Sequence, residues 1–509
     1  MSSLFLFSLD CRKFFFYNYL MKLKLKNHNY KYGVEQMLST LFPGEKPDYS
    51  GFSKDERGMS ISLSKKEKFT TAVCVYNDGE SRHSGRAAVK TALLTDETST
   101  DSLCQYVIKN AIYRSVLASG RAKPPWGSLT GVRPGKLMHG IIGSSSSKSE
   151  AIRRFENDYD VSKSRAALCY ETSLCTVRAR QSLKPYDACL YIGIPFCPTR
   201  CAYCSFVSQS VEKSIKLIEP FLSALREEIA AVSEQIKKAN LNIVSVYFGG
   251  GTPTTLSASQ LNSLLSYLYS EIDLSSVREF TVEAGRPDTI TEDKLEVLKH
   301  WGVNRVSVNP QTMQDNVLNA IGRKHTAKDI TDALALVRKT GGFAVNMDII
   351  AGLPEDSVEG FSDTLKKVLA LNPENITVHT LSLKRGSAIT LSNALIPTAA
   401  EVSQMLDAAY SALRESGYLP YYLYRQKNMS GGFENTGWTL PGHENLYNIC
   451  MMEEICSIIG LGGGGSTKLI SPEGGRNIRI TDPKYPLEYI ELINKICSDK
   501  TKIGEFCNV

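Results

Sequence analysis

The sequence predicts an α/β fold in which strands and helices alternate through the middle of the chain. From residue 190 onward, short apolar runs alternate with longer stretches of helical spacing, and chemically unusual residues follow where the apolar runs end. Strands that alternate with helices pair in parallel through right-handed crossovers. The pattern alone allows either an open doubly wound sheet or a partial barrel. Six runs are expected to be strands: 190–194, 243–249, 280–284, 305–308, 345–350 and 376–380.

The stretches between these runs are predicted to be helices that pack on one face of the sheet. Their apolar residues recur at the spacing of a single helix face. In both architectures the functional loops lie at the carboxyl ends of the strands. The predicted helices are 217–238, 258–272, 292–301, 327–340 and 360–371.

The regions on either side of this repeat are predicted to be further domains. Residues 21–185 mix strand and helix patterns, with helical spacing over 106–117, and indicate an N-terminal α+β domain. Residues 186–399 form the predicted core, and residues 400–509 a small C-terminal domain that completes the substrate side. The loop at 123–134 is rich in Pro and Gly, and we expect Trp126 to pack it, rather than to serve a site with Arg133.

We expect the first 20 residues to be an upstream extension that is disordered or absent from the natural product, with Met21 as an alternative start. Their apolar stretch is far shorter than the roughly 20 residues that span a bilayer, and no later stretch spans one either. The net charge of +6 is small against 59 basic and 53 acidic residues, so we expect no nucleic-acid partner. The alternating Met21–Lys26 segment predicts an edge or half-buried strand rather than a basic arm.

Thirteen cysteines without a secretory signal indicate a reducing compartment, and we expect the cytoplasm. Most of the cysteines are scattered, and Cys11, Cys74, Cys104 and Cys450 are predicted to be small buried hydrophobes.

One group is closely spaced, in the segment Cys197-Pro-Thr-Arg-Cys201-Ala-Tyr-Cys204 after the first predicted strand. Three thiolates on one tight loop can ligate three irons of a 4Fe-4S cluster and leave the fourth iron open to a small chelating molecule. A structural zinc site would need four ligands. None of the seven histidines falls between residues 140 and 299, and Cys189 lies one strand upstream. The sequence therefore favours the cluster over zinc.

Other polar residues and glycines stand where later strands end. Gly249, Gly250 and Gly251 precede Thr252, and glycines let a backbone approach a ligand closely. Glu283 ends the third run, where its carboxylate could accept hydrogen bonds or form an ordinary surface ion pair. Asp348 lies within an apolar run and is expected to have a partner. Gln311 follows the fourth run, and Arg323 comes a dozen residues later.

The spacing Cys-x-x-x-Cys-x-aromatic-Cys after the first strand of such a repeat resembles the radical S-adenosylmethionine (SAM) superfamily. The resemblance implies a partial (β/α)6 barrel and a 4Fe-4S cluster on Cys197, Cys201 and Cys204, with SAM on the fourth iron. It also implies a reducing electron donor such as flavodoxin or ferredoxin. By motif, SAM would be bound by Tyr191, Tyr203, Gly249, Gly250, Gly251, Thr252, Glu283, Gln311, Arg323 and Asp348, with Tyr191 also near the cluster as a catalytic residue.

More narrowly, five segments resemble the oxygen-independent coproporphyrinogen III oxidase family. The likeness runs from about residue 190 to 470, and Leu129-Thr-Gly-Val-Arg-Pro134 resembles its longer coproporphyrinogen dehydrogenase branch. The resemblance implies conversion of two propionates of a tetrapyrrole to vinyl groups, which gives protoporphyrinogen IX. The five segments begin at Tyr191 (Tyr-Ile-Gly-Ile-Pro-Phe-Cys), Gly249 (Gly-Gly-Gly-Thr-Pro), Gly322 (Gly-Arg-Lys-His), Asp348 (Asp-Ile-Ile-Ala-Gly-Leu-Pro) and Pro441 (Pro-Gly-His-Glu).

Two departures from that family bear on the substrate. Its established oxidases carry a fourth cysteine two residues after the third, whereas this chain has Ser205-Phe206, as do relatives that traffic haem. They also carry histidine where this chain has Gly193. A haem-delivery protein and a radical SAM enzyme acting on another carboxylate substrate therefore remain alternatives.

Several further residues would distinguish these alternatives. A haem carrier would give more importance to His379 or His443, although a lone histidine at a strand end is usually structural. Substrate carboxylates would be met by Lys384, Arg385 or Arg425, if these are not solvated surface charges. The run Gly462–Gly465 either lets backbone approach a ligand or forms a mobile loop.

Overall fold

The chain forms two compact units. The computed structural model describes residues 20–51, 53, 55–131, 133–199, 201–204, 209–210, 214–382, 395–426, 432–471 and 477–507. The first unit comprises the described residues of 20–131 and 155–165 with 432, and the second comprises those of 133–154, 166–426 and 433–507. No described helix is long and apolar enough to cross a bilayer. The three predicted domains remain a prediction. The predicted extension, residues 1–20, lies outside the described residues except for Leu20, which begins the first described strand.

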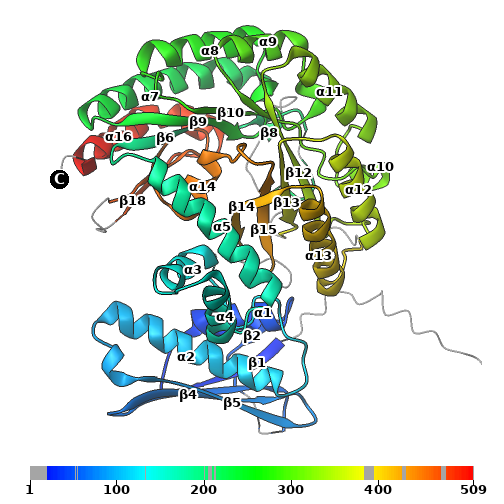
Figure 1. The fold of residues 1–509 in the computed structure, drawn as a ribbon. Helices are drawn as coiled ribbons and strands as arrows, with labels where there is room; N and C mark the ends of the chain where they lie inside the picture. Colours follow the sequence, from blue (N-terminus) through cyan, green and yellow to red (C-terminus); the bar gives the residue numbers. More distant parts are fainter. Residues whose placement is uncertain are drawn as a thin grey trace, which may run out of the picture. The chain divides into compact units, whose positions relative to one another are not determined.

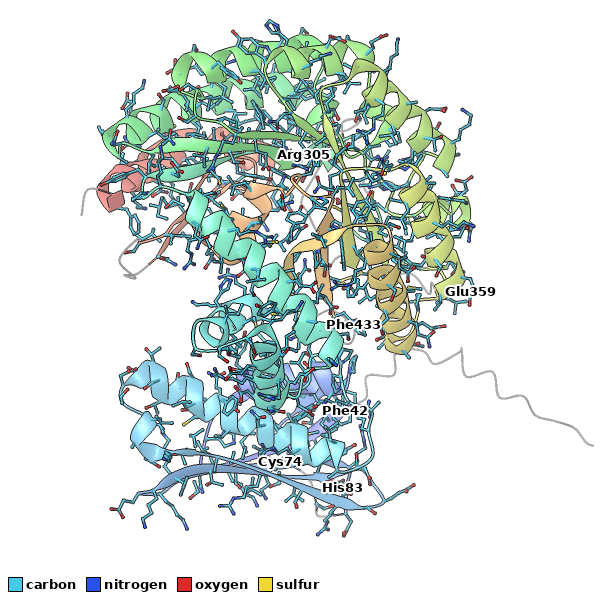
Figure 2. All side chains as sticks on the ribbon, in the orientation of Figure 1. Phe42, Cys74, His83, Arg305, Glu359 and Phe433 are labelled. Carbon is cyan, nitrogen blue, oxygen red and sulfur yellow. The ribbon has the colours of Figure 1, made fainter. Side chains whose placement is uncertain are left out.

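The first unit is built on a five-stranded sheet in the order β2-β1-β3-β4-β5. Met21 and Leu23 of β1 are buried between two neighbouring strands, which confirms the half-buried strand predicted there. Helices α1 and α2 join the sheet in one apolar core that includes Phe42 and Cys74 (Figure 2). The elements are β1 (Leu20–Lys26), α1 (Lys31–Leu41), β2 (Lys46–Asp48), β3 (Gly58–Lys65), β4 (Phe69–Asn77), β5 (Arg82–Lys90) and α2 (Glu97–Leu117).

A turn-rich segment and three helices follow α2 in the sequence. Trp126 in this segment is fully buried, which confirms its predicted role in packing. The helices are α3 (Pro134–Gly143), α4 (Lys148–Tyr159) and α5 (Lys163–Ser182).

The second unit contains an eleven-stranded sheet whose central strands are parallel. All six predicted strands are present and run parallel in the order β13-β12-β11-β10-β9-β6. The open order of the sheet, with helices outside, agrees with a partial barrel. The six strands are β6 (Asp187–Ile194), β9 (Asn242–Gly250), β10 (Glu279–Glu283), β11 (Arg305–Ser307), β12 (Ala344–Ala351) and β13 (Asn375–Thr380).

Helices cover the outer side of these strands (Figure 1). Capping boxes begin two of them, at Ser257 with Gln260 before α8 and at Thr326 with Asp329 before α11. Each box satisfies otherwise unpaired backbone N–H groups at the helix start. The helices are α7 (Ile218–Lys238), α8 (Ala258–Glu271), α9 (Glu292–His300), α10 (Asp315–Ala320), α11 (Ala327–Thr340) and α12 (Val358–Ala370), and all five predicted helices are confirmed among them.

The C-terminal part extends both sides of the same sheet. Strand β16 pairs in parallel with β6, while β15 pairs antiparallel with β13 on the opposite side. The glycine-rich segment thus supplies a strand that periodicity did not predict. The elements are α13 (Ala399–Glu415), β14 (Leu419–Arg425), β15 (Glu434–Thr439), α14 (Leu446–Glu453), β16 (Ser457–Gly462), β17 (Ser466–Leu469), β18 (Ile478–Thr481), α15 (Pro486–Glu491) and α16 (Ile493–Cys507), with the short pair β7 (Phe196–Cys197) and β8 (Gln209–Ser210) near β6.

Candidate active site

A cavity of about 570 Å³ lies at the carboxyl ends of the parallel strands. This size is ordinary for a small-molecule site. Loops after β6, β9, β10 and β11 and side chains of β12 and β13 meet there. The predicted site residues that line it are Tyr191, Cys197, Cys201, Tyr203, Cys204, Gly250, Gly251, Thr252, Glu283, Gln311, Arg323 and Asp348.

The three cysteines of the predicted cluster lie on one half-buried loop after β6. The Cys204 N–H donates to the Cys201 carbonyl at 3.1 Å, and the Ala202 N–H ties the loop to Ile321. Thr252 Oγ1 lies 3.6 Å from Cys197 Sγ, and Arg286 Nη1 donates to Cys201 Sγ at 3.4 Å. All three thiols face the cavity, where polar groups support two of them.

The glycines after β9 bring backbone close to this loop. Gly250 has φ of +105°, a conformation that side chains strongly disfavour. A Cβ on Gly251 would lie 2.4 Å from the Phe196 carbonyl oxygen and 3.0 Å from Cys197 Sγ. Gly249 does not line the cavity, and a Cβ there would come within 3.1 Å of the rings of Tyr191 and Tyr247. The predicted close backbone approach is therefore present at Gly250 and Gly251.

Glu283 carries a carboxyl group into the cavity from the end of β10. The phenol of Tyr247, on neighbouring β9, donates to its Oε1 at 2.6 Å. Burial raises the pKa of Glu283 to about 7, although the Tyr247 hydrogen bond acts in the opposite direction. This carboxyl group can therefore change its protonation state near neutral pH.

Asp348 has the partners that its place in an apolar strand required. Asn346 Nδ2 donates to its Oδ1 at 2.8 Å, and His379 Nε2 lies 3.8 Å from its Oδ2. Burial alone would raise the pKa of Asp348, but the hydrogen bonds from His379, Asn346 and Thr377 outweigh burial and lower it. Asp348 is thus held as a carboxylate at neutral pH.

Gln311 and Arg323 are held near Asp348 by hydrogen bonds to backbone carbonyl groups. Gln311 has φ of +66°, and its N–H donates to the Asp348 carbonyl at 2.8 Å. Arg323 donates to the Asn309 carbonyl at 2.7 Å and to the Tyr203 hydroxyl at 3.3 Å. The buried Nε of Arg323 and the Ser307 hydroxyl have no partner among the described residues. These two groups are free to bind a ligand in the cavity.

Three stacked tyrosines line the cavity wall next to Glu283. The rings of Tyr247 and Tyr447 have centroids 4.4 Å apart, and Tyr191 lies 6.2 and 6.0 Å from them. Sequence reasoning predicted Tyr191 but not Tyr247, Tyr447 or Arg286. The position of Arg286, three residues after β10, was a strand-end signal that could have identified it.

The absence of histidine at position 193 has a steric cause. The Gly463 N–H donates to the Gly193 carbonyl at 2.9 Å, and a Cβ on Gly193 would lie 2.5 Å from the Gly463 carbonyl oxygen. No side chain fits there while this backbone contact exists. Gly464, in the same run, lines the cavity.

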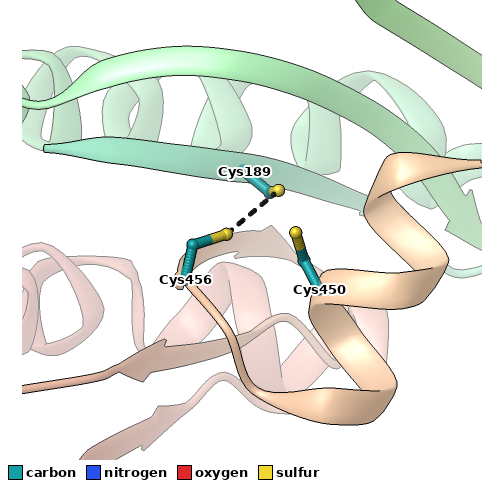
Figure 3. A group of neighbouring side chains, drawn as sticks. All are labelled: Cys189, Cys450 and Cys456. Atoms are coloured by element: carbon teal, nitrogen blue, oxygen red, sulfur yellow. Dashed lines mark hydrogen bonds between the residues drawn. The ribbon is translucent and has the colours of Figure 1, made fainter. Parts of the chain in front are cut away.

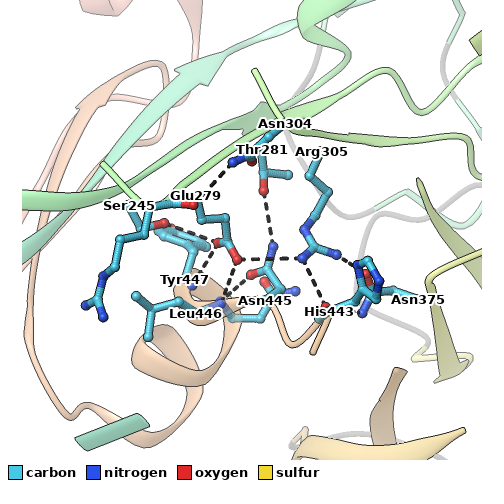
Figure 4. A network of polar contacts seen from close by, with 12 residues as sticks. Ser245, Glu279, Thr281, Asn304, Arg305, Asn375, His443, Asn445, Leu446 and Tyr447 are labelled. Carbon is cyan, nitrogen blue, oxygen red and sulfur yellow. Dashed lines mark hydrogen bonds and ion pairs between the residues drawn. The ribbon is translucent and has the colours of Figure 1, made fainter. Parts of the chain in front are cut away.

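Of the residues predicted to bind substrate carboxylates or haem, only His379 is found among the described residues that line the cavity. Lys384 and Arg385 fall outside the described residues. Arg425 is buried, and is not among the cavity residues. His379 lines the cavity, whereas the carbonyl of His443 accepts hydrogen bonds from Arg305 and Asn375 in a network away from it (Figure 4).

That network anchors the start of α14. Glu279, the first residue of β10, accepts hydrogen bonds from the backbone N–H groups of Leu446 at 2.8 Å and Tyr447 at 3.1 Å. Arg305 lies 3.9 Å from Glu279 as a buried ion pair (Figure 4). The segment Pro441-Gly-His-Glu444 thus precedes the start of α14, and the Glu279 hydrogen bonds hold that start in a position where Tyr447 stacks with Tyr191 and Tyr247.

Comparisons with known proteins agree with this geometry. The radical SAM superfamily model matches residues 191–368. The oxygen-independent coproporphyrinogen-III oxidase-like protein HemZ of Bacillus subtilis is 38% identical over 90% of this chain and 92% of its own length. The heme chaperone HemW of Escherichia coli is 26% identical over 59% of this chain and 75% of its own length. The structure of E. coli coproporphyrinogen III oxidase (HemN) matches with a TM-score of 0.50 at 22% identity, covering 64% of this chain and 73% of that one.

The chain therefore belongs to the radical SAM superfamily, and within it to the family of oxygen-independent coproporphyrinogen III oxidase-like proteins. The structural match supports the fold.

Proposed function

We propose that the chain is a cytoplasmic oxidoreductase that converts propionate side chains of coproporphyrinogen III to vinyl groups, with protoporphyrinogen IX as the product in haem biosynthesis. The observation that carries this proposal is the convergence of three loop thiols, a glycine-lined backbone, two carboxyl groups and an arginine on one cavity. A reducing protein such as flavodoxin or ferredoxin would supply the electron that cleaves SAM. Each propionate would lose one hydrogen atom and CO2, and a one-electron acceptor would take the remaining electron.

The residues present fit the two cofactors that the family implies. Cys197, Cys201 and Cys204 would hold a 4Fe-4S cluster, and the glycine segment with Glu283, Gln311, Arg323 and Asp348 would hold SAM. The free Ser307 hydroxyl and Arg323 Nε are further donors for a polar ligand. When bound, the two cofactors supply one-electron reduction and abstraction of a hydrogen atom from carbon.

The protein's own residues would orient the ligands and exclude water. Asp348 would accept hydrogen bonds as a fixed carboxylate, and Tyr191 would pack close to the cluster as a catalytic residue. Tyr422, Tyr424, Met451 and Met452 also line the cavity, and their aromatic and thioether surfaces suit a flat macrocycle.

Haem carriage is a second candidate because heme chaperones are among the relatives. His379 would then be the residue of interest, since it lines the cavity. The Ser205-Phe206 sequence after the third cluster cysteine also favours this reading over the established oxidases.

One anaerobic experiment tests both. The full chain, reconstituted with iron and sulfide, is incubated with SAM, reduced flavodoxin and coproporphyrinogen III, and the products are analysed by mass spectrometry. We expect 5'-deoxyadenosine and a divinyl product, both lost in Cys201→Ser and kept in the control Cys497→Ser. Cleavage of SAM without a vinyl product would reject this substrate, and haem uptake with a Soret band and no product would favour the carrier.

A further inference from the structure

A second group of three cysteines lies in the second unit, away from the cluster loop. Cys189 of β6, Cys450 of α14 and Cys456 just before β16 bring their Sγ atoms within 4.8 Å of one another (Figure 3). The Sγ atoms of Cys189 and Cys456 are 3.6 Å apart. Cys450 was predicted to be an isolated buried hydrophobe. It is buried, but it has two thiol neighbours that the sequence separation concealed.

The cysteine trio is enclosed by apolar and aromatic side chains. Cys189 and Cys450 are fully buried, and Cys456 is 8% exposed. Tyr447 and Ile458 belong to the same buried cluster, with Leu183, Tyr191, Tyr247 and Met451 packed against it. Water and hard cations have little access to such a site, whereas thiols are soft ligands.

We propose that Cys189, Cys450 and Cys456 form a buried three-thiolate binding site for one thiophilic d10 metal ion of the class of Cu⁺, which three sulfurs can satisfy without the fourth ligand that a structural zinc site needs. A metal–sulfur distance of about 2.3 Å places neighbouring thiolates about 3.8–4.0 Å apart in tetrahedral or trigonal geometry. The observed spacing of 3.6 Å, with all three atoms within 4.8 Å, lies around this value. Small movements of the three cysteine side chains would place their sulfurs at the spacing of ligands around one metal ion.

The spacing distinguishes this trio from the cluster loop. Among the described residues, the trio is the only group of three His, Cys, Asp or Glu side chains with such mutual spacing, so Cys197, Cys201 and Cys204 do not meet it. A cluster of four irons carries its ligands at separate corners, whereas a single ion needs them around one point. The two cysteine groups therefore suit different inorganic partners.

A disulfide would account for the trio less well. It would use two sulfurs at about 2.05 Å and leave the third thiol without a role. A single metal ion would use all three sulfurs, which lie within 4.8 Å of one another.

The bound ion would join parts of the chain that are distant in sequence. Cys189 lies on the strand that leads into the cluster loop, and Cys450 lies on the helix that carries Tyr447. The ion would therefore link β6 to the C-terminal segment next to the tyrosine stack. Its contribution would be to stability rather than to chemistry.

The test uses the full chain with Cys197, Cys201 and Cys204 replaced by Ser, so that no cluster competes. Cd²⁺ is titrated anaerobically, and the thiolate-to-metal charge-transfer absorbance and the thermal midpoint are recorded, with Cu⁺ as competitor. We expect one Cd²⁺ per chain, displaced by Cu⁺, and a raised midpoint. Adding Cys189→Ala, Cys450→Ala or Cys456→Ala should each weaken binding by more than about 100-fold, since even outer contacts cost a metal site about 10- to 100-fold.

The matched control is Cys169→Ala, which removes another fully buried thiol and should leave Cd²⁺ binding unchanged. Circular dichroism of the metal-free variants shows whether each one folds. Binding that survives loss of any trio cysteine in a folded variant would overturn the proposal. Failure of the folded parent to bind Cd²⁺, with a Cys189–Cys456 disulfide forming under diamide, would also overturn it and assign the pair to thiol oxidation. Neither outcome depends on turnover of a tetrapyrrole.

Discussion

Tyr247 and Glu283 are joined by a 2.6 Å hydrogen bond between adjacent strands at the edge of the cavity. The hydrogen bond fixes the orientation of the Glu283 carboxyl group, and burial raises its pKa to about 7. The chemistry of the site should therefore respond to pH in a range where most carboxylates do not titrate.

We expect SAM affinity to increase as pH rises through 7. Below its pKa Glu283 is protonated and is a weaker acceptor for the amino or ribose groups of SAM, whereas above it the group is a carboxylate. Isothermal titration one unit either side of pH 7 measures this change. Glu283→Gln should bind weakly at both pH values, while the exposed Glu292→Gln should keep the wild-type profile. An unchanged pH dependence in Glu283→Gln would show that another group titrates.

Loss of any one loop cysteine should prevent assembly of a stable cluster. Cys197, Cys201 and Cys204 supply all the protein thiolates that the proposed cluster uses, so each serine variant leaves a further iron without its ligand. Iron and acid-labile sulfide after anaerobic reconstitution should fall to background, and the visible absorbance should disappear. Cys497→Ser, on α16, should retain the wild-type content. Full iron content in Cys204→Ser would remove that residue from the ligand set.

The C-terminal helix α16 is fixed by a buried charge. Lys500 Nζ lies 2.8 Å from Glu228 Oε1 and 2.9 Å from Asp482 Oδ2, and all three side chains are buried. Lys500→Met would leave two carboxylates without a cation and should lower the free energy of unfolding by about 3–5 kcal/mol. Urea unfolding measures the loss. The control Lys502→Met removes an exposed partner of Asp499 and should change stability by less than about 1 kcal/mol. An equal loss of unfolding free energy in Lys500→Met and Lys502→Met would show that the buried ion pairs of Lys500 stabilise the fold no more than the exposed pair.

A side chain at position 193 should lower the free energy of unfolding. Gly193→Ala would place a methyl group 2.5 Å from the Gly463 carbonyl and is expected to destabilise the fold by about 1–3 kcal/mol. Gly193→His should cost more. Gly140 in helix α3 offers the matched control, because nothing lies within 4 Å of its added Cβ and Gly140→Ala should stabilise the chain by up to about 1 kcal/mol. A neutral Gly193→Ala would show that the Gly463 backbone yields easily.

The alternating elements and the cysteine loop were predictable because their signals are local. Apolar periodicity marks each strand and helix, and Cys197, Cys201 and Cys204 lie within eight residues of sequence. Since the carboxyl ends of parallel strands lie on one edge, the strand-end residues Glu283 and Asp348 could be expected at the same site.

The features that sequence reasoning missed depend on contacts between distant segments. Tyr447 stacks with Tyr191 and Tyr247, and the Glu279 carboxylate accepts hydrogen bonds from the backbone at the start of α14. The segment Ser457–Gly462 pairs with β6, which is distant in the sequence, and Gly462 allows a close backbone approach to Gly193. The periodicity of apolar residues in one segment does not predict a contact with another segment that is distant in the sequence.

The pairing of β16 with β6 also constrains how the protein is made. One edge of β6 can pair as soon as β9 has been synthesised, but the other edge stays unpaired until residues 457–462 have been synthesised. Until then the nascent sheet exposes an unpaired strand edge, which is a template for intermolecular association. Premature termination before residue 457 should therefore yield aggregates rather than a shortened folded protein.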